Sequence, residues 1–471
     1  MNDANTSQAF QELMAIRGLG EPESTYIDGN DPVLSTRFPL GETAAAVMAG
    51  VGVAVTDLWE RKHGSRQTVS VAAAHAAAAL KSYAFMRLAG DDGNPFGNAR
   101  GAGLTNPMPT RDGRFFLPHF GMPHLAERVC GVLGCPLEPD AVIKAIAARD
   151  ALELEDAVAE VNACGAMVRS NSEWLAHPHG QILATRPVVT ITRIGNGPPT
   201  PLPAIGKASA DGDRPLAGIR ALDLTRVLAG PTCARTLAEH GADVLMVAGK
   251  QLPQVDRFVM DTGHGKRSSF LDLDTADGRD GLMGLVADAD IFSQGYRPGV
   301  LAKRGFGPEQ LAEARPGIIY TSMSCYGSGG PFSNRAGWEQ LAQTVTGVAF
   351  EHGDPTPALL PAAACDYMTG YLAAFGTLIA LNRRASEGGS WHVEASLCQS
   401  GMFLHRQHRV DFDAPNMDVD PERINEIIMT SDTRFGEMTH LGPILSLSET
   451  PPHWSSPTVP LGTHEPVWLP V

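Results

Sequence analysis

The stretch PLAGIRALDLTRVLAGPTCARTLAEHGADVLMVAGK, residues 215–250, decides the fold of this 471-residue chain. It contains an apolar strand at 220–224, a Gly-Pro turn, an amphipathic helix at about 232–240 and a second apolar strand at 243–247. Strand and helix patterns that alternate over these lengths predict a βαβ unit, in which a helix joins two parallel strands.

The first turn of this unit argues against a dinucleotide site. Residues 228–231 read Leu-Ala-Gly-Pro and supply one glycine where the G-x-G-x-x-G fingerprint needs three. The second strand is followed by Ala248 rather than by an acidic residue that binds a ribose hydroxyl. The sequence therefore predicts a nucleotide-handling fold that does not bind NAD.

The rest of the second half extends this pattern. Further strands are expected at 291–293, 318–322 and 391–396, with helical patterns between the earlier ones, which predicts an α/β fold with a doubly wound parallel sheet. A Gly/Pro-rich stretch at 196–215 has the composition of a linker. We expect three regions: 1–205, 206–405 and a closing segment at 406–471.

Composition excludes several classes of function. A net charge of −15 argues against nucleic-acid binding, which needs clustered Lys and Arg. The seven cysteines form no C-x-x-C pair, so neither a disulfide framework nor a zinc site is expected, and a reducing cytoplasm fits. Neither an export signal nor a membrane anchor is predicted, because the apolar run at 43–55 is too short to span a bilayer.

Several further motifs occur in a definite order: GKRS at 265–268, YRPGVLAKRGFGPEQL at 296–311, GIIYTSMSCYGSGGP at 317–331, GWEQLAQTVTG at 337–347 and DYMTGYLAAFGTLIALNRR at 366–384. Together with the stretch at 215–250 they resemble the class III coenzyme A transferases, a family that also contains the α-methylacyl-CoA racemases. The resemblance implies a Rossmann-like CoA-binding half, a smaller α+β domain resembled by residues 112–180, and an interlocked homodimer.

Part of the chain repeats. Residues 41–78 resemble residues 366–396 at a shift of 324 positions, which places Glu42 opposite Asp366. We interpret Glu42 as a relic or a helix cap. The order of the halves departs from the family's single-copy order, so the sequence leaves open whether one chain makes one complete active site.

Asp366 is the candidate nucleophile. An aspartate that opens a helix is on spacing alone most often an N-cap, but by resemblance this position holds the family's nucleophilic aspartate. Glu339 aligns with a family position near it, and a solvated glutamate on a helix face is the alternative. Gly329 and Gly330, after a strand, either let the backbone approach substrate or form an ordinary turn.

Coenzyme A carries phosphates that need basic groups and backbone amides. By resemblance, the CoA groove is lined by Leu228, Ala229, Leu271, Tyr296, Arg297 and Lys303, with Lys266 and Arg267 as further basic candidates. GHGKRS at 263–268 is not a P-loop, because Met260 and Arg267 replace the required glycine and Ser/Thr. No metal site is predicted; His177 and His179 are interpreted as loop residues.

These observations predict a CoA-transferase that moves coenzyme A from an acyl-CoA to a small carboxylic acid through an aspartyl intermediate, without a permanently bound cofactor. Two alternatives stay open. A racemase would use a His-Asp pair where this chain has Trp338 and Glu339. The other alternative is a non-catalytic CoA-binding relic.

Overall fold

The computed structural model describes residues 2–90, 102–203, 213–411 and 417–470. Its first βαβ unit consists of β9 (Arg220–Leu224), α9 (Ala229–Glu239) and β10 (Asp243–Ala248), with the two strands parallel. The expected Gly-Pro turn is wrong: Gly230 and Pro231 lie in the first turn of α9, where proline costs no hydrogen bond. A Cβ on Gly230 would lie 2.2 Å from the Thr225 side chain, so the helix start needs glycine to pack on the strand end.

The main sheet has seven strands in the order β11-β10-β9-β12-β13-β14-β8. β11 (Lys266–Phe270), β12 (Ile291–Gln294), β13 (Ile319–Ser324) and β14 (Ser390–Ser396) run parallel to β9 and β10, whereas β8 (Val189–Gly195) is antiparallel at one edge. The parallel strands thus follow the order 3-2-1-4-5-6, and the order reverses between β9 and β12. Ligands of such sheets bind at this reversal, beyond the carboxyl ends of the strands.

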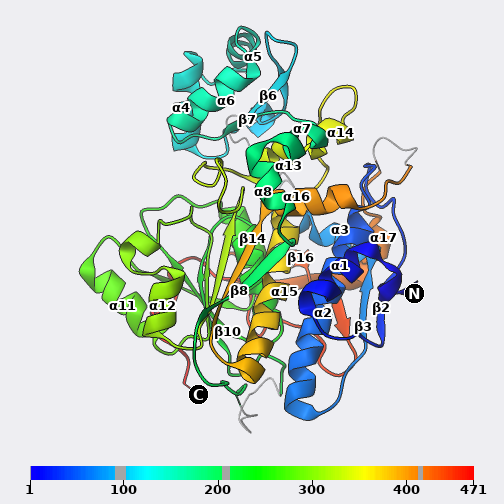
Figure 1. Cartoon of the computed structure of the whole chain (residues 1–471), viewed down its shortest axis with the longest axis vertical. Helices are drawn as coiled ribbons and strands as arrows, with labels where there is room; N and C mark the ends of the chain where they lie inside the picture. Colours follow the sequence, from blue (N-terminus) through cyan, green and yellow to red (C-terminus); the bar gives the residue numbers. More distant parts are fainter. Residues whose placement is uncertain (1, 91–101, 204–212, 412–416, 471) are drawn as a thin grey trace.

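Helices cover both faces of the sheet, which confirms the predicted α/β class. α9 and α15 (Ala364–Glu387) share one apolar core with the sheet, and α11 (Ala276–Val286) packs in a second core that contains Leu222, Leu245 and Phe292. α12 (Pro308–Ala314) lies near α11 in Figure 1, away from α15.

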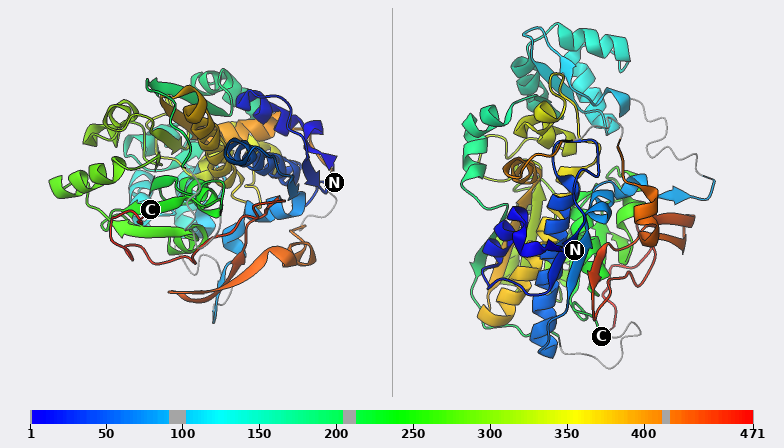
Figure 2. Two further views of the ribbon diagram at one scale, coloured as in Figure 1. Left: turned by 90° about the horizontal axis from the view of Figure 1, so that it is seen from below. Right: turned by 90° about the vertical axis from the view of Figure 1, so that its right-hand side faces the viewer.

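A smaller α+β unit stands at one end of the long axis (Figures 1 and 2). It contains the antiparallel sheet of β5 (Met108–Pro109), β6 (Phe115–Pro118) and β7 (Gly165–Met167), packed with α4 (Pro123–Leu133), α5 (Pro139–Ala147) and α6 (Ala151–Glu160) around its own core. The division of the chain near residues 205 and 405 stays a prediction, and β8, which precedes residue 205, completes the main sheet.

The expected repeat is visible in the structure. α2 (Leu40–His63) and α15 are both 24 residues long, and each end of α15 lies 324 positions after that of α2. β3 (Val69–Ala72) pairs parallel with β2 (Thr25–Asp28) and antiparallel with β17 (Leu445–Leu447), as β14 pairs with β13 and β8. The two long helices pack against each other in one core. One chain therefore contains a partial second copy of the α15–β14 region of its second half.

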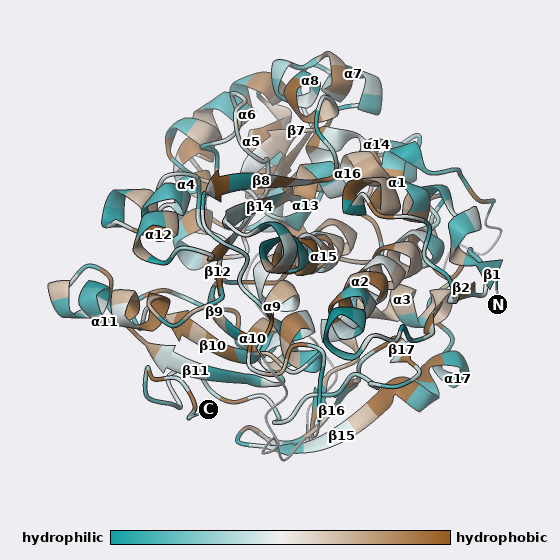
Figure 3. Ribbon diagram, turned by 60° about the horizontal axis from the view of Figure 1, so that its bottom comes forward, coloured by the Kyte–Doolittle hydropathy of each residue, from teal (hydrophilic) through white to brown (hydrophobic). Residues whose placement is uncertain are grey.

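α2 and α15 are also long and apolar enough to cross a membrane, by length and composition alone. Buried core helices pass the same test, and 94% and 100% of their apolar windows are buried in this structure. Figure 3 shows both helices inside the protein, with other elements around them. The two helices are therefore weak evidence for a membrane span.

The remaining elements connect these units. They are β1 (Asn2–Asp3), η1 (Ala4–Thr6), α1 (Gln8–Arg17), α3 (Ala73–Ala79), η2 (Ser82–Ala84), β4 (Arg87–Leu88), η3 (Ala102–Leu104), α7 (Asn171–Ala176), α8 (Pro178–Ala184), α10 (Asp256–Thr262), η4 (Ala302–Arg304), α13 (Glu339–Thr346), α14 (Val348–His352), α16 (Leu397–Arg406), α17 (Pro421–Ile424), η5 (Asn425–Ile427), β15 (Ile428–Thr433) and β16 (Gly436–Leu441).

Candidate functional site

A cavity of about 500 Å³ lies at the carboxyl ends of the central strands, where the strand order reverses. Asp366 lies in its wall. The other walls come from both halves of the chain. The smaller unit supplies residues 122–128 and 162–164, and the second half supplies residues between 224 and 304, between 323 and 338, and Leu397. A single chain thus supplies every wall of this cavity that the described residues form.

Asp366 lies in the first turn of α15 and is buried, with 6% exposure. The N-cap interpretation is wrong: the N-cap is Ala363, and it makes no side-chain capping bond. The free backbone N–H groups of this turn are bound by Glu339 instead. Its Oε1 accepts the N–H of Cys365 at 3.1 Å, and its Oε2 accepts the N–H of Asp366. Glu339 is therefore a buried helix-start partner rather than a solvated residue.

Glu339 and Asp366 form a buried carboxyl pair. Burial raises the pKa of Glu339 to about 7, although Gln343 Nε2 donates to it at 2.6 Å and the backbone bonds oppose the rise. Burial and then the charge of Glu339 raise the pKa of Asp366 well above its ordinary value of 3.8. Each carboxyl group thus makes ionisation of the other less favourable.

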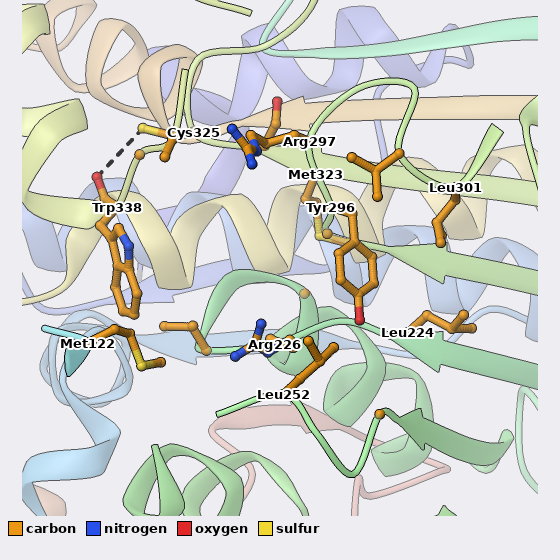
Figure 4. Close-up of a pocket in the computed structure, with 18 of the residues that line it drawn as sticks. Met122, Leu224, Arg226, Leu252, Tyr296, Arg297, Leu301, Met323, Cys325 and Trp338 are labelled. Carbon is orange, nitrogen blue, oxygen red and sulfur yellow. Dashed lines mark hydrogen bonds between the residues drawn. The ribbon is translucent and has the colours of Figure 1, made fainter. Parts of the chain in front are cut away.

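Four arginines line the same cavity as Asp366. Arg128, Arg226, Arg297 and Arg304 line it, and among the described residues only Arg304 of these four has a carboxylate partner, Asp274 at 2.7 Å. Arg297 donates to Asn162 Oδ1 of the smaller unit at 2.9 Å. In Figure 4, Trp338 and Cys325 lie on the left, Tyr296 lies to the right with Leu301, and Arg226 lies between the two sides. Unpaired guanidinium groups here can bind phosphate.

The structure brings together only part of the predicted CoA groove. Ala229, Leu271, Tyr296 and Arg297 line the cavity, whereas Leu228 is buried in the core behind it.

Three predicted cations lie elsewhere. Lys266 is buried and donates to Asp223 at 2.8 Å, Arg267 pairs with Asp243 at 2.9 Å, and Lys303 is exposed outside the cavity. The Arg267–Asp243 pair joins the adjacent strands β11 and β10, and the Lys266–Asp223 pair joins β11 to β9 across β10.

The glycines Gly329 and Gly330 also lie outside this cavity. A Cβ on Gly330 would lie 2.0 Å from the His179 ring, and one on Gly329 would lie 2.8 Å from the guanidinium of Arg186. Both therefore serve close packing against α8 and the residues that follow it. His179, which we had interpreted as a loop residue, lies within α8 and is fully buried.

Sequence reasoning missed Arg128, Asn162 and Arg226. Arg226 follows β9 directly, so the rule that ligands bind beyond strand ends could have found it. Arg128 and Asn162 reach the site only because the smaller unit packs over it, and no local pattern predicts that. Across the described residues, the structure holds no cluster of three or more His, Cys, Asp or Glu side chains suited to a metal ion.

Comparisons with known proteins agree with this geometry. A family model described as CoA-transferase family III matches residues 3–200 and 216–462. An acetyl-coenzyme A transferase of Hypoxylon pulicicidum is 34% identical over 327 residues, covering 64% of this chain and 54% of that protein. The succinyl-CoA–L-malate CoA-transferase beta subunit of Chloroflexus aurantiacus is 36% identical over 206 residues, covering 40% of this chain and 50% of the relative.

This chain thus spans about half the length of these relatives. Among solved structures, a CAIB/BAIF family protein from Brucella suis is 28% identical, with a TM-score of 0.37 over 48% of this chain and 65% of the other.

Proposed function

This chain belongs to CoA-transferase family III, and we propose that it moves coenzyme A from an acyl-CoA thioester to a carboxylic acid, with Asp366 as the nucleophile. The observation that carries the proposal is the position of Asp366. It is a buried carboxyl group in the wall of a cavity that arginines without a carboxylate partner among the described residues also line, so one ligand can contact both the arginines and the carboxyl group.

The first half-reaction splits the thioester. A carboxylate oxygen of Asp366 attacks the thioester carbonyl carbon, the C–S bond breaks, and coenzyme A leaves as a thiolate. The product is a mixed anhydride. The thiolate then attacks the aspartyl carbonyl carbon, which releases the donor acid as a carboxylate and leaves an aspartyl-CoA thioester.

The second half-reaction reverses these steps with the acceptor. Its carboxylate attacks the aspartyl-CoA carbonyl and displaces the thiolate, which gives a new mixed anhydride. Thiolate attack on the acceptor's acyl carbon then gives the new acyl-CoA and restores the Asp366 carboxylate. Bond energy of the thioester is kept throughout, so no nucleotide hydrolysis or resident cofactor is required.

Glu339 positions the nucleophile. Its bonds to the N–H groups of Cys365 and Asp366 fix the first turn of α15, and its charge keeps Asp366 basic. Trp338 lines the cavity where the racemase alternative requires a histidine, which supports transfer over racemisation.

Assembly and location follow as part of the proposal. The cavity is lined by one chain, so no partner residue is needed to build the walls that the structure describes. The homodimer and the cytoplasmic location implied at the outset stay predictions.

The test is mass spectrometry of the protein incubated with a panel of acyl-CoAs, followed by hydroxylamine, which converts an activated aspartyl group to a hydroxamate. We expect modification of the peptide that contains Asp366, together with CoA exchange into added carboxylic acids. Asp366→Asn should lose both. Glu42→Gln, which changes the equivalent carboxylate of the repeat, is the matched control and should keep both. Exchange by Asp366→Asn at the wild-type rate would contradict the proposal.

A further inference from the structure

A second cavity, of about 180 Å³, adjoins the first. The two share Tyr296, Arg297, Leu301, Met323 and Ser324 in their walls. Figure 4 shows Tyr296, Arg297 and Met323 close together at this junction. The second cavity extends from the junction along one face of the sheet, below the loop that leads into η4 and α12.

This face of the sheet is the one opposite α15. Thr321 of β13 bonds Thr377 of α15, and a Cβ on Gly376 of α15 would touch Val393 of β14. Because side chains alternate along a strand, the neighbours Ser322, His392 and Glu394 point to the other face, into the second cavity.

The polarity of these strand residues is not explained by folding. Strands of a parallel sheet that is covered on both faces are normally apolar throughout. Burying a hydroxyl, an imidazole and a carboxylate costs free energy unless each is paired. Half-buried Ser322, His392 and Glu394 therefore indicate a cavity built for a polar occupant.

These groups form a connected wall of donors and acceptors. Ser322 Oγ lies 2.8 Å from His392 Nε2, and Ser328 Oγ donates to Glu394 at 2.9 Å. Arg186 Nη1 donates to Ser328 at 3.0 Å. Neither Arg186 nor Glu394 has an ion-pair partner among the described residues.

A buried acceptor lies in the same wall. Gln399 is 5% exposed and lines the second cavity. Its amide nitrogen donates to the Leu183 carbonyl at 2.8 Å, and its Oε1 has no hydrogen-bond partner within the described part of the chain. The wall thus has more acceptors than donors at the Gln399 end. An occupant with a hydroxyl group would supply the missing donor.

We propose that the second cavity holds the tail of the transferred acid and selects a short hydroxylated carboxylic acid; this inference rests on the proposed function. The carboxyl group of the acid lies at Asp366, and its hydroxyl group lies against the wall of Ser322, His392, Glu394 and Gln399, where Gln399 Oε1 lacks a donor among the described residues. A volume of about 180 Å³ equals roughly six water molecules at about 30 Å³ each, which fits a tail of a few carbon atoms. An alkyl tail would leave the polar wall unpaired.

The experiment compares acceptors that differ by one hydroxyl group. Acetyl-CoA is the donor, because its acyl group has no tail to enter the cavity, and 3-hydroxybutyrate, butyrate and hexanoate are the acceptors. We expect kcat/KM for 3-hydroxybutyrate to exceed that for butyrate by about tenfold or more, the factor that one well-placed hydrogen bond gives. Ser322→Leu fills the cavity and should abolish this preference while the acetyl adduct on Asp366 still forms. Ser446→Leu, the same change on the exposed face of β17, is the matched control.

A binding measurement separates this inference from the proposed function. Calorimetry with Asp366→Asn, which cannot react, should show tighter binding of 3-hydroxybutyrate than of butyrate, and Ser322→Leu in the same background should remove the difference. Equal binding of the two acids, or a preference for hexanoate, overturns the cavity assignment. Absence of any Asp366 adduct with selective binding intact overturns the transferase function and leaves the cavity assignment supported.

Discussion

Replacing Glu339 with glutamine should move the acid limb of the reaction to lower pH. The Asp366 side chain must be ionised to attack, and its raised pKa means that activity is lost as pH falls through that pKa. One of the two causes of the rise is the charge of Glu339, which Glu339→Gln removes. Burial, the larger cause, stays in place, so the pKa of Asp366 should fall but remain above its ordinary 3.8.

The size of the shift follows from the geometry. Glu339 accepts the backbone N–H of Asp366 itself, so its charge lies close to the Asp366 carboxyl group and disfavours the ionisation of that group. Each tenfold change in an ionisation equilibrium corresponds to about 1.4 kcal/mol. Below the wild-type pKa, the ionised fraction of Asp366 and the rate of adduct formation should therefore rise about tenfold or more.

The assay is the single-turnover rate of Asp366 adduct formation between pH 5 and 9 (about the range in which the protein's raised carboxyl groups titrate). Glutamine accepts only one of the two N–H groups that Glu339 binds, so urea unfolding must accompany the kinetics to record any loss of stability. Glu351→Gln, an isosteric change at a carboxylate paired with Arg409 away from the cavity, is the control. An acid limb that stays in place or moves to higher pH in Glu339→Gln would refute the reasoning.

Three further outcomes are expected. Lys266→Met should lower the free energy of unfolding in urea by roughly 3–5 kcal/mol, because it leaves a buried aspartate unpaired, whereas Lys303→Met should leave it unchanged. Arg226→Gln should raise the Kd for coenzyme A about tenfold, with the effect shrinking at high salt, whereas Arg267→Gln, outside the cavity, should change the Kd little in the same titration. The melting temperature should rise as pH falls from about 8.5 to 7, because burial raises the pKa of Glu239 to about 8 and the folded state then binds more protons than the unfolded state. Below about pH 6.5 the melting temperature should fall, because burial lowers the pKa of several histidines and the unfolded state then binds more protons.

Five of the seven strands of the main sheet, β9, β10, β12, β13 and β14, could be predicted from the sequence to within about two residues, because buried parallel strands leave continuous apolar runs, whereas β8 and β11 were missed. The start of α9 could not, since Gly230 and Pro231 read locally as a turn and become helical only by packing on Thr225. The roles of individual side chains were harder to predict. Lys266 and Arg267 have the right residue types for phosphate binding, yet carboxylates on β9 and β10 bind them in the folded chain.

The Glu339–Asp366 pair could be predicted only in part from the sequence. Asp366 was found by resemblance, whereas spacing alone predicted an N-cap. The bond from Glu339 to the start of α15 joins residues 27 positions apart and depends on how α13 and α15 meet. Likewise, Arg128 and Asn162 reach the cavity from the smaller unit, and both lie more than 160 residues before Cys325, another lining residue, in the chain.

The internal repeat allows the starts of the two long helices, α2 and α15, to be compared. Asp31 accepts the N–H groups of Gly41 at 3.2 Å and Glu42 at 2.7 Å, just as Glu339 accepts those at the start of α15, and burial raises the pKa of Asp31 to about 6.

A carboxyl pair at the start of a long helix is thus present twice, but Asp31 and Glu42 are only half-buried, and different residues face the two pairs. The residues that line the cavity of about 290 Å³ at Glu42, among those that the structure describes, include no arginine or lysine, and Glu42 is 3.3 Å from His408. The small sheet beside Glu42 is β1-β2-β3-β17. Among the described residues it contains no counterpart of β9 to β12, the part of the main sheet that faces Asp366. Under the proposed function, a CoA thioester is therefore expected at Asp366 and not at Glu42, because arginines that can bind its phosphates line the cavity of Asp366 alone among these two cavities.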